Sequence, residues 1–259
     1  MPSAWPAVLL TLVLAACSCK RVPLDTCDPR GAAPCATFSE VTVGRDRRVY
    51  LVVTPGGEAA KPRALVFVLH GLDATPAEVR ELMGRGLERA AGSAAVFVYP
   101  DGNGGWPDQQ GRDVAFFDAV RAKVSAEVAV DRVFVTGFSF GGEMANTLAC
   151  ARGGVIRAIA PLSAGCRQVR DCVGGPVAAW MANGTQDTIA PADHAEAFGE
   201  RWRRASGCAA TRQATSPASC QAYDGCSPSH PVHVCAFPGG HEVQAWEPAA
   251  VWAFFSGLR

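Results

Sequence analysis

Continuous apolar runs, with helical segments between them, constrain the fold of this 259-residue chain most strongly. Runs without polar alternation are typical of strands that are covered on both faces of a sheet. Their alternation with helices predicts right-handed crossovers and a mostly parallel α/β sheet with helices on both faces. The expected strands are 64–69, 94–98, 132–136, 156–160 and 177–181, and the expected helices are 76–89, 113–128, 143–152 and 191–205.

Further elements are predicted on either side of this core. Residues 41–43 and 48–53 alternate as the strands of a hairpin, with residues 44–46 as its turn. A last strand is expected over 232–237 and a last helix over 243–255. The sequence contains no internal repeat and no linker that would divide it, and its 49% hydrophobic content is enough for one large core. We therefore expect one α/β domain over residues 38–259.

The charge balance excludes the partners that a strongly charged chain would attract. Lys plus Arg and Asp plus Glu are equal, at 24 each, and no basic run interrupts the sequence. Nothing in this pattern favours a nucleic acid or an anionic membrane surface. We expect no nucleic-acid partner, and nothing in the sequence calls for a cofactor.

The first residues differ in character from the rest of the chain. The apolar core 8–14 is too short to span a bilayer, and Ala15, Ala16 and Cys17 follow it. This pattern resembles a bacterial lipoprotein signal, although residues 1–6 contain no Lys or Arg. It predicts a signal peptide over 1–16, a lipidated Cys17 with a tether over 17–37, and an exported protein anchored in the cell envelope. An ordinary secretory signal, which would give a secreted protein, is the alternative.

The remaining cysteines indicate an oxidising compartment. The chain has 11 cysteines, so setting Cys17 aside leaves an even number for disulfides, each worth about 2–4 kcal/mol. Their spacing shows no zinc pattern, and we expect no metal. A local Cys166–Cys172 bridge is expected, whereas the four cysteines between Cys208 and Cys235 leave three pairings open.

A Gly-x-Ser-x-Gly sequence at residues 137–141 stands between the strand 132–136 and the helix 143–152. Glycine on both sides permits a sharp turn that exposes the Ser139 hydroxyl above the end of the sheet. A serine that follows a strand and precedes a helix in this way is in the context in which it acts as a nucleophile. The alternative interpretation is an ordinary glycine-rich loop.

Two further residues follow the ends of later strands, where catalytic groups of open α/β sheets gather. Asp187 follows the strand 177–181, and His241 follows the strand 232–237. A serine needs a base to take its proton, which suits His241, and Asp187 would fix the histidine tautomer. The alternatives are a loop aspartate and a surface histidine. The order Ser, Asp, His is that of α/β-hydrolases.

The tetrahedral intermediate of such a reaction needs hydrogen-bond donors for its oxyanion. The N–H of Phe140 is one expected donor, and the N–H of Leu72, in the loop after the strand 64–69, is the other. His70 is placed at the substrate cleft, with a structural role in orienting that loop more plausible than a catalytic one. Trp106 either lines the cleft or packs as a loop aromatic, and Asp113 is expected to cap a helix.

With these motifs in this order, the chain resembles the secreted α/β-hydrolase esterases that include feruloyl esterases and poly(3-hydroxybutyrate) depolymerases. The resemblance covers about residues 38–258 and implies a disulfide-stabilised α/β-hydrolase catalytic domain. It also implies that Ser139, Asp187 and His241 act through an acyl-enzyme, with the amides of Leu72 and Phe140 as oxyanion hole. The matching segments are 68–71, 99–102, 113–116, 130–139, 184–187 and 239–241.

The chain departs from the family pattern beside the predicted triad. Asn183 precedes Gly184 and Thr185 where many members have His-Gly-Thr, and Glu242 and Val243 follow the histidine where many have Trp-Pro. These positions are expected to border the cleft, so the sequence does not identify the acyl and alcohol groups of the substrate. We predict an exported, monomeric serine carboxylesterase acting on a small-molecule or polymer-linked ester. A non-catalytic envelope lipoprotein and a serine peptidase of the same fold are the alternatives.

Overall fold

The computed structural model of the chain describes residues 34–56, 62–165, 172 and 174–258. The predicted signal peptide, the predicted lipidation site Cys17 and most of the predicted tether lie outside the described residues. The first strand begins at Cys35, which pairs with Thr54 and is disulfide-bonded. Residues 35–37 therefore belong to the sheet and not to the tether over 17–37, because pairing with the second strand continues to Cys35.

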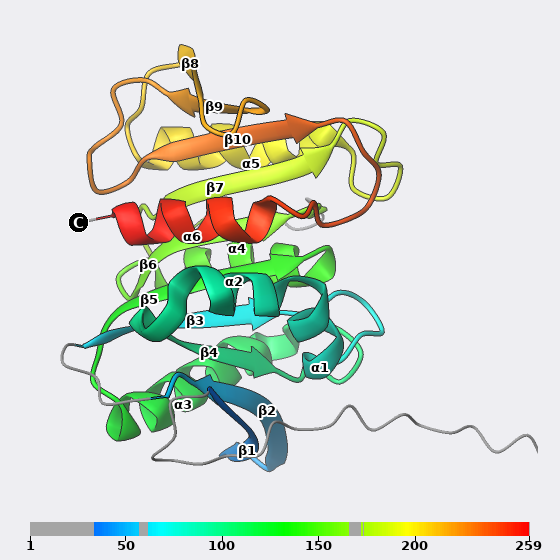
Figure 1. Cartoon of the computed structure of the whole chain (residues 1–259), viewed down its shortest axis with the longest axis vertical. Helices are drawn as coiled ribbons and strands as arrows, with labels where there is room; N and C mark the ends of the chain where they lie inside the picture. The colour runs from blue at the N-terminus through cyan, green and yellow to red at the C-terminus, as the bar shows by residue number, and fades with distance from the viewer. Residues whose placement is uncertain (1–33, 57–61, 166–171, 173, 259) are drawn as a thin grey trace, which may run out of the picture.

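One ten-stranded sheet runs through the molecule in the order β1-β2-β4-β3-β5-β6-β7-β10-β9-β8 (Figure 1). The central strands from β4 to β10 are parallel, and both edges are antiparallel. The predicted mostly parallel sheet is confirmed. The strands are β1 (Cys35–Val43), β2 (Asp46–Thr54), β3 (Arg63–Leu69), β4 (Ala95–Pro100), β5 (Val130–Phe138), β6 (Ile156–Leu162), β7 (Ala178–Gly184), β8 (Arg212–Thr215), β9 (Cys220–Tyr223) and β10 (Val232–Phe237).

Helices cover both faces of the sheet, as predicted (Figure 1). One face carries α3 (Arg112–Glu127), α4 (Phe140–Arg152) and α5 (Ala192–Ala205), and the other carries α1 (Pro76–Val79), α2 (Arg85–Ala91) and α6 (Glu247–Gly257). The continuous apolar run of β3 contributes side chains to the cores on both faces, because successive side chains point to opposite sides of a strand. Leu65, Phe67 and Leu69 enter one core, and Ala64, Val66 and Val68 enter the other.

The predicted helix over 76–89 is interrupted in the structure. A π-helix, η1 (Arg80–Gly84), separates α1 from α2. Short 3₁₀ turns follow at η2 (Gly92–Ala94) and η3 (Gln109–Gly111). The predicted helix over 243–255 begins only at Glu247, because the residues before it form the loop that carries His241. Among the described residues, no helix is both long and apolar enough to cross a bilayer.

Three disulfides join described cysteines, namely Cys150–Cys172, Cys208–Cys226 and Cys220–Cys235. The predicted Cys166–Cys172 bridge is wrong. The chain after Cys172 returns beside the end of α4, where the Gly174 N–H donates to the Cys150 carbonyl at 2.8 Å. Cys150 is therefore adjacent to Cys172 in space, although it is distant in sequence.

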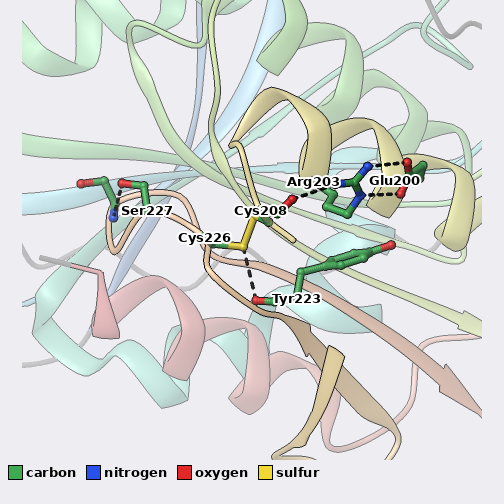
Figure 2. Close-up of a disulfide and its surroundings, with 7 residues drawn as sticks. Glu200, Arg203, Cys208, Tyr223, Cys226 and Ser227 are labelled. Atoms are coloured by element: carbon green, nitrogen blue, oxygen red, sulfur yellow. Dashed lines mark hydrogen bonds and ion pairs between the residues drawn. A yellow bond between two sulfur atoms is a disulfide. The ribbon is translucent and has the colours of Figure 1, made fainter. Parts of the chain in front are cut away.

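The last two disulfides hold an edge of the sheet that the sequence analysis did not anticipate. Cys220–Cys235 joins β9 to β10 at directly paired positions. Cys208–Cys226 ties the chain after α5 to the loop after β9, beside Arg203 (Figure 2). The Arg203 guanidinium bonds Glu200 and also donates to the Cys208 carbonyl at 2.7 Å. These links hold the short strands β8 and β9 on the sheet.

Candidate active site

Ser139 stands on a strained turn between β5 and α4. Its φ is 55° and its ψ is −120°, a region that residues other than glycine rarely adopt. A Cβ on Gly141 would lie 2.2 Å from the Leu69 carbonyl oxygen, and one on Gly137 would lie 2.6 Å from the Gly141 carbonyl carbon. Both glycines are therefore required for the turn to pack against β3. The structure forms the sharp turn that the sequence predicts.

The structure brings the three predicted catalytic side chains together. The Ser139 Oγ lies 2.8 Å from His241 Nε2, and Asp187 Oδ2 lies 2.7 Å from His241 Nδ1. Asp187 is buried, and its Oδ1 accepts from the N–H groups of Ile189 and Ala190, each at 2.8 Å. An acceptor-only carboxylate at Nδ1 places the histidine proton there, so Nε2 is the nitrogen that can accept the serine proton.

Adjacent parallel strands position the Asp187 and His241 loops. β7 and β10 are paired, so the chain segments that follow them leave the sheet side by side. The Thr185 N–H donates to the Phe237 carbonyl, and the Gln186 N–H donates to the Gly239 carbonyl, both at 2.8 Å. Backbone hydrogen bonds thus fix one loop to the other before any side chain contributes.

Glu247 hydrogen-bonds to the histidine segment, the loop that contains His241 and Gln244. It was not singled out from the sequence. It is fully buried at the start of α6, and its Oε2 accepts from the Gln244 N–H at 2.6 Å. Burial raises the pKa of Glu247 to about 8, with a smaller contribution from the Glu242 carboxylate. The carboxyl is therefore mostly protonated at neutral pH. The only sequence signal was an acidic residue at the start of an otherwise apolar helix.

His70 lies beneath the predicted oxyanion loop and does not line the cleft. It is 0% exposed, so the expectation that it borders substrate is wrong. Its Nε2 accepts from the Gly102 N–H at 2.8 Å, and its Nδ1 donates to the Gly71 carbonyl at 2.7 Å. Burial lowers the pKa of His70, which agrees with a neutral ring in this tautomer. The ring orients the loop, as the structural interpretation predicted.

The expected oxyanion donors, the N–H groups of Leu72 and Phe140, lie in segments that line the cleft. Phe140 is the first residue of α4, so its N–H has no intrahelical acceptor. No hydrogen bond between described groups occupies the Leu72 N–H. Neither N–H is thus bonded to a described protein group, as the predicted role requires.

Trp106 is buried and is not among the residues that line the Ser139 cleft. Its exposed fraction is 4%, its indole N–H donates to the His70 carbonyl at 2.7 Å, and its ring packs 4.8 Å from that of His70. It borders a small neighbouring pocket that shares Phe140 and Glu143 with that cleft. The packed-aromatic alternative is the correct one, and the Trp106 placement in the substrate cleft is wrong.

The cleft beside Ser139 has a volume of about 540 Å³ and mostly aliphatic and aromatic walls. Leu72, Leu82 and Ile189 line it with 63%, 50% and 62% of their surfaces exposed. Exposed large aliphatic residues gathered around one opening are typical of a binding surface for an apolar group. The arrangement therefore suits an acyl or alcohol group with a substantial apolar body.

Asp113 has a different role from the predicted helix cap. The caps are made by Asp108, whose Oδ1 accepts from the N–H groups of Asp113 and Val114. Asp113 instead forms a buried ion pair with Arg48 at 2.9 Å. Within the part of the chain that the structure describes, no group of three or more His, Cys, Asp or Glu residues could hold a metal ion.

Comparison with known proteins places the chain beside fungal esterases. No family model matches the chain. Feruloyl esterase C of Emericella nidulans is 35% identical over 230 residues, which are 80% of this chain and 83% of that protein. Feruloyl esterase D of Neurospora crassa is 30% identical over 243 residues, 82% of each protein.

Solved structures share the fold at much lower sequence identity. An acetyl xylan esterase from Aspergillus awamori superposes with a TM-score of 0.65 at 16% identity, over 84% of this chain and 99% of that one. A CE1 ferulic acid esterase from Anaeromyces mucronatus, solved in complex with ferulic acid, gives 0.60 at 14% identity, over 88% and 92%. The predicted fold class is confirmed.

Proposed function

The chain belongs to the feruloyl esterase family and is a serine carboxylesterase with the α/β-hydrolase fold, and on this premise we propose that it cleaves feruloyl esters with Ser139 as nucleophile. The observation that carries the proposal is the 2.8 Å contact between Ser139 Oγ and His241 Nε2. A contact of this length lets the imidazole take the hydroxyl proton as attack begins.

The proposed reaction has two half-reactions. Ser139 Oγ attacks the ester carbonyl carbon while His241 Nε2 takes its proton, and the N–H groups of Leu72 and Phe140 stabilise the oxyanion. The intermediate collapses as His241 protonates the departing alcohol, which leaves an acyl-enzyme. Water then attacks the acyl carbon, gives its proton to His241, and releases the acid as Ser139 regains its proton. Asp187 keeps the imidazole oriented and stabilises its cation.

The feruloyl substrate class is proposed from two observations. The relatives that match most of the chain bear the name feruloyl esterase. The cleft beside Ser139, with a volume of about 540 Å³ and mostly apolar walls, suits a planar aromatic acyl group. The non-catalytic alternative does not explain why Ser139 is kept in a strained conformation with its base in contact.

The disulfides indicate an exported protein, because such bonds persist in oxidising compartments. We propose further that residues 1–16 are a cleaved signal, that Cys17 carries a lipid anchor, and that the enzyme is a monomer. In a bacterial expression host, the Cys17→Ser variant should move from the membrane fraction to the soluble fraction. Equal membrane retention of both proteins would contradict the anchor.

Kinetics on two esters tests the proposed function. The wild type should hydrolyse both methyl ferulate and p-nitrophenyl acetate, and Ser139→Ala should lower kcat by at least about 10⁴-fold on each. Circular dichroism and melting temperature should match the wild type, since the substitution removes only one oxygen atom and leaves the backbone of the turn unchanged. Retained activity would refute the nucleophile. Activity on p-nitrophenyl acetate alone would refute the feruloyl substrate but not the esterase.

A further inference from the structure

One wall of the cleft is formed by α1 and η1 and takes no part in the catalytic contacts. Glu78, Val79 and Leu82 line the cleft from this wall, next to Leu72 of the oxyanion loop. We call these three residues the α1–η1 wall. It combines two aliphatic side chains with Glu78, which with Glu143 is one of the two carboxylates among the described residues that line this mostly apolar cleft.

Glu78 is held in place by the start of α1. Its Oε2 accepts from the N–H and the hydroxyl of Thr75, both at 2.9 Å, while the Thr75 Oγ1 accepts from the Glu78 N–H at 3.3 Å. This reciprocal capping box fixes the carboxylate at a helix N-terminus, which also favours its negative charge. No hydrogen bond from a described protein group occupies Oε1. The capping box thus holds Oε2 and leaves Oε1 as an acceptor without a described protein partner.

The π-helix that follows is held by a buried network. Arg80 bonds Glu88 at 2.7 and 3.0 Å, and the Tyr99 hydroxyl donates to Glu88 at 2.6 Å. Gly84 is required, because a Cβ there would lie 2.4 Å from the Tyr99 hydroxyl oxygen. π-helical turns inside α-helices are frequent at functional sites, since they change where side chains point. Here the turn contains Leu82, which lines the cleft with half of its surface exposed.

We propose that Glu78 accepts a hydrogen bond from a hydroxyl at the far end of an aromatic acyl group, so that the cleft selects 4-hydroxyaryl over 4-alkoxyaryl esters. The proposal rests on the proposed feruloyl esterase function. A carboxylate can only accept, so the group it recognises must donate. A phenol donates and its methyl ether does not, while the aliphatic side chains beside Glu78 cover the ring of either.

The proposal predicts a measurable ratio. Methyl ferulate and methyl 3,4-dimethoxycinnamate differ by one methyl group at the 4-position. A hydrogen bond to a charged group corresponds to roughly a ten- to hundredfold preference for the phenol in kcat/KM. Glu78→Gln should reduce that preference to within about threefold of unity, because its carbonyl oxygen replaces Oε2 in the capping box and its amide nitrogen becomes a donor.

Glu81→Gln is the matched control. Glu81 lies on η1, is exposed, pairs with Arg85 at 2.7 Å, and does not line the cleft. It should keep the wild-type preference. Because both esters are measured on the same sample, the ratio is independent of the fraction of folded enzyme in each variant.

Each outcome decides the proposal. A wild-type ratio near unity, a ratio unchanged by Glu78→Gln, or an equal loss in Glu81→Gln would overturn the role of Glu78 and leave the feruloyl esterase function intact. If the wild type cleaves p-nitrophenyl acetate but neither cinnamate ester, the feruloyl substrate class is wrong and this proposal falls with it.

Discussion

Two parts of the same cleft are built by different means. The turn around Ser139 is fixed by backbone contacts, since Gly137 and Gly141 pack against neighbouring carbonyl groups with no room for a Cβ. The α1–η1 wall is fixed by side chains, through a capping box and a buried network centred on Glu88. Backbone packing leaves a fixed glycine spacing in the sequence. Side-chain networks leave no comparable short motif.

This difference in construction corresponds to a difference in proposed role. The turn contributes to the catalytic reaction, and the α1–η1 wall contributes to substrate selectivity. The turn and the paired loops after β7 and β10 bring together the groups that the proposed reaction uses. The α1–η1 wall takes no part in those contacts and lines another part of the cleft. Substitutions on the two sides should therefore produce different kinetic signatures.

Substitution of a triad residue should have the largest effect on activity. Asp187→Asn leaves the loop geometry nearly unchanged but favours the wrong histidine tautomer, so kcat should fall by about 10⁴-fold on every ester. Steady-state kinetics with methyl ferulate and p-nitrophenyl acetate measures this. Asp193→Asn, an exposed carboxylate at the start of α5, is the control and should behave as the wild type. A loss confined to methyl ferulate would contradict the account.

Substitutions in the network beside the α1–η1 wall should lower the free energy of unfolding and the substrate selectivity, while the catalytic triad remains intact. Arg80→Met removes the cation that bonds the mostly buried carboxylate of Glu88, which corresponds to about 3–5 kcal/mol of unfolding free energy. Arg85→Met removes an ion pair with Glu81 whose side chains are both partly exposed, and it should cost less than about 1 kcal/mol. Urea unfolding of both variants gives the comparison. Equal losses would show that the buried network does not support the wall.

The histidine segment should show a pH-dependent effect of intermediate size. Because the folded pKa of Glu247, at about 8, exceeds that of the unfolded chain, its stabilising contribution is complete below about pH 4.5 and is lost as the pH rises toward 8. Glu247→Gln cannot ionise, so its stability advantage over the wild type should grow across that range, on the order of 4 kcal/mol by pH 8. Melting temperatures from pH 5 to 9 test this, and a constant difference would refute it.

The smallest expected effect is on the apolar face of the wall. Leu82→Ala removes aliphatic surface that would cover an aromatic acyl group, so kcat/KM for methyl ferulate should fall about three- to tenfold, or roughly 1 kcal/mol. The effect on p-nitrophenyl acetate should be smaller, because an acetyl group has no ring to cover. Val155→Ala, which changes an exposed aliphatic residue outside the cleft, serves as the control.

The sequence predicted the parts of the molecule that depend on local pattern. Unbroken apolar runs identified the central strands, and their ends located Ser139, Asp187 and His241, which the structure brings into contact. This works because parallel strands place their carboxyl ends at one edge of the sheet. Local pattern alone was therefore enough to find groups that lie far apart along the chain.

Features that depend on tertiary contacts were missed or misassigned. Cys172 bonds Cys150 because the chain returns beside α4, and His70 is covered by the loop that contains Gly102 and Trp106. The π-turn packs against Tyr99 of β4, whose hydroxyl bonds Glu88, the carboxylate that also accepts from Arg80 of the turn. None of these partners is close enough in sequence for periodicity or motif spacing to show it.

The most direct test of the account is the site at which a fluorophosphonate probe labels the enzyme. Such a probe reacts with a serine only when a base has activated it, and peptide mass spectrometry locates the adduct. The account predicts one adduct, on the peptide that contains Ser139, and loss of that adduct in His241→Ala. An adduct on another serine, or labelling of Ser139 that persists without His241, would contradict it.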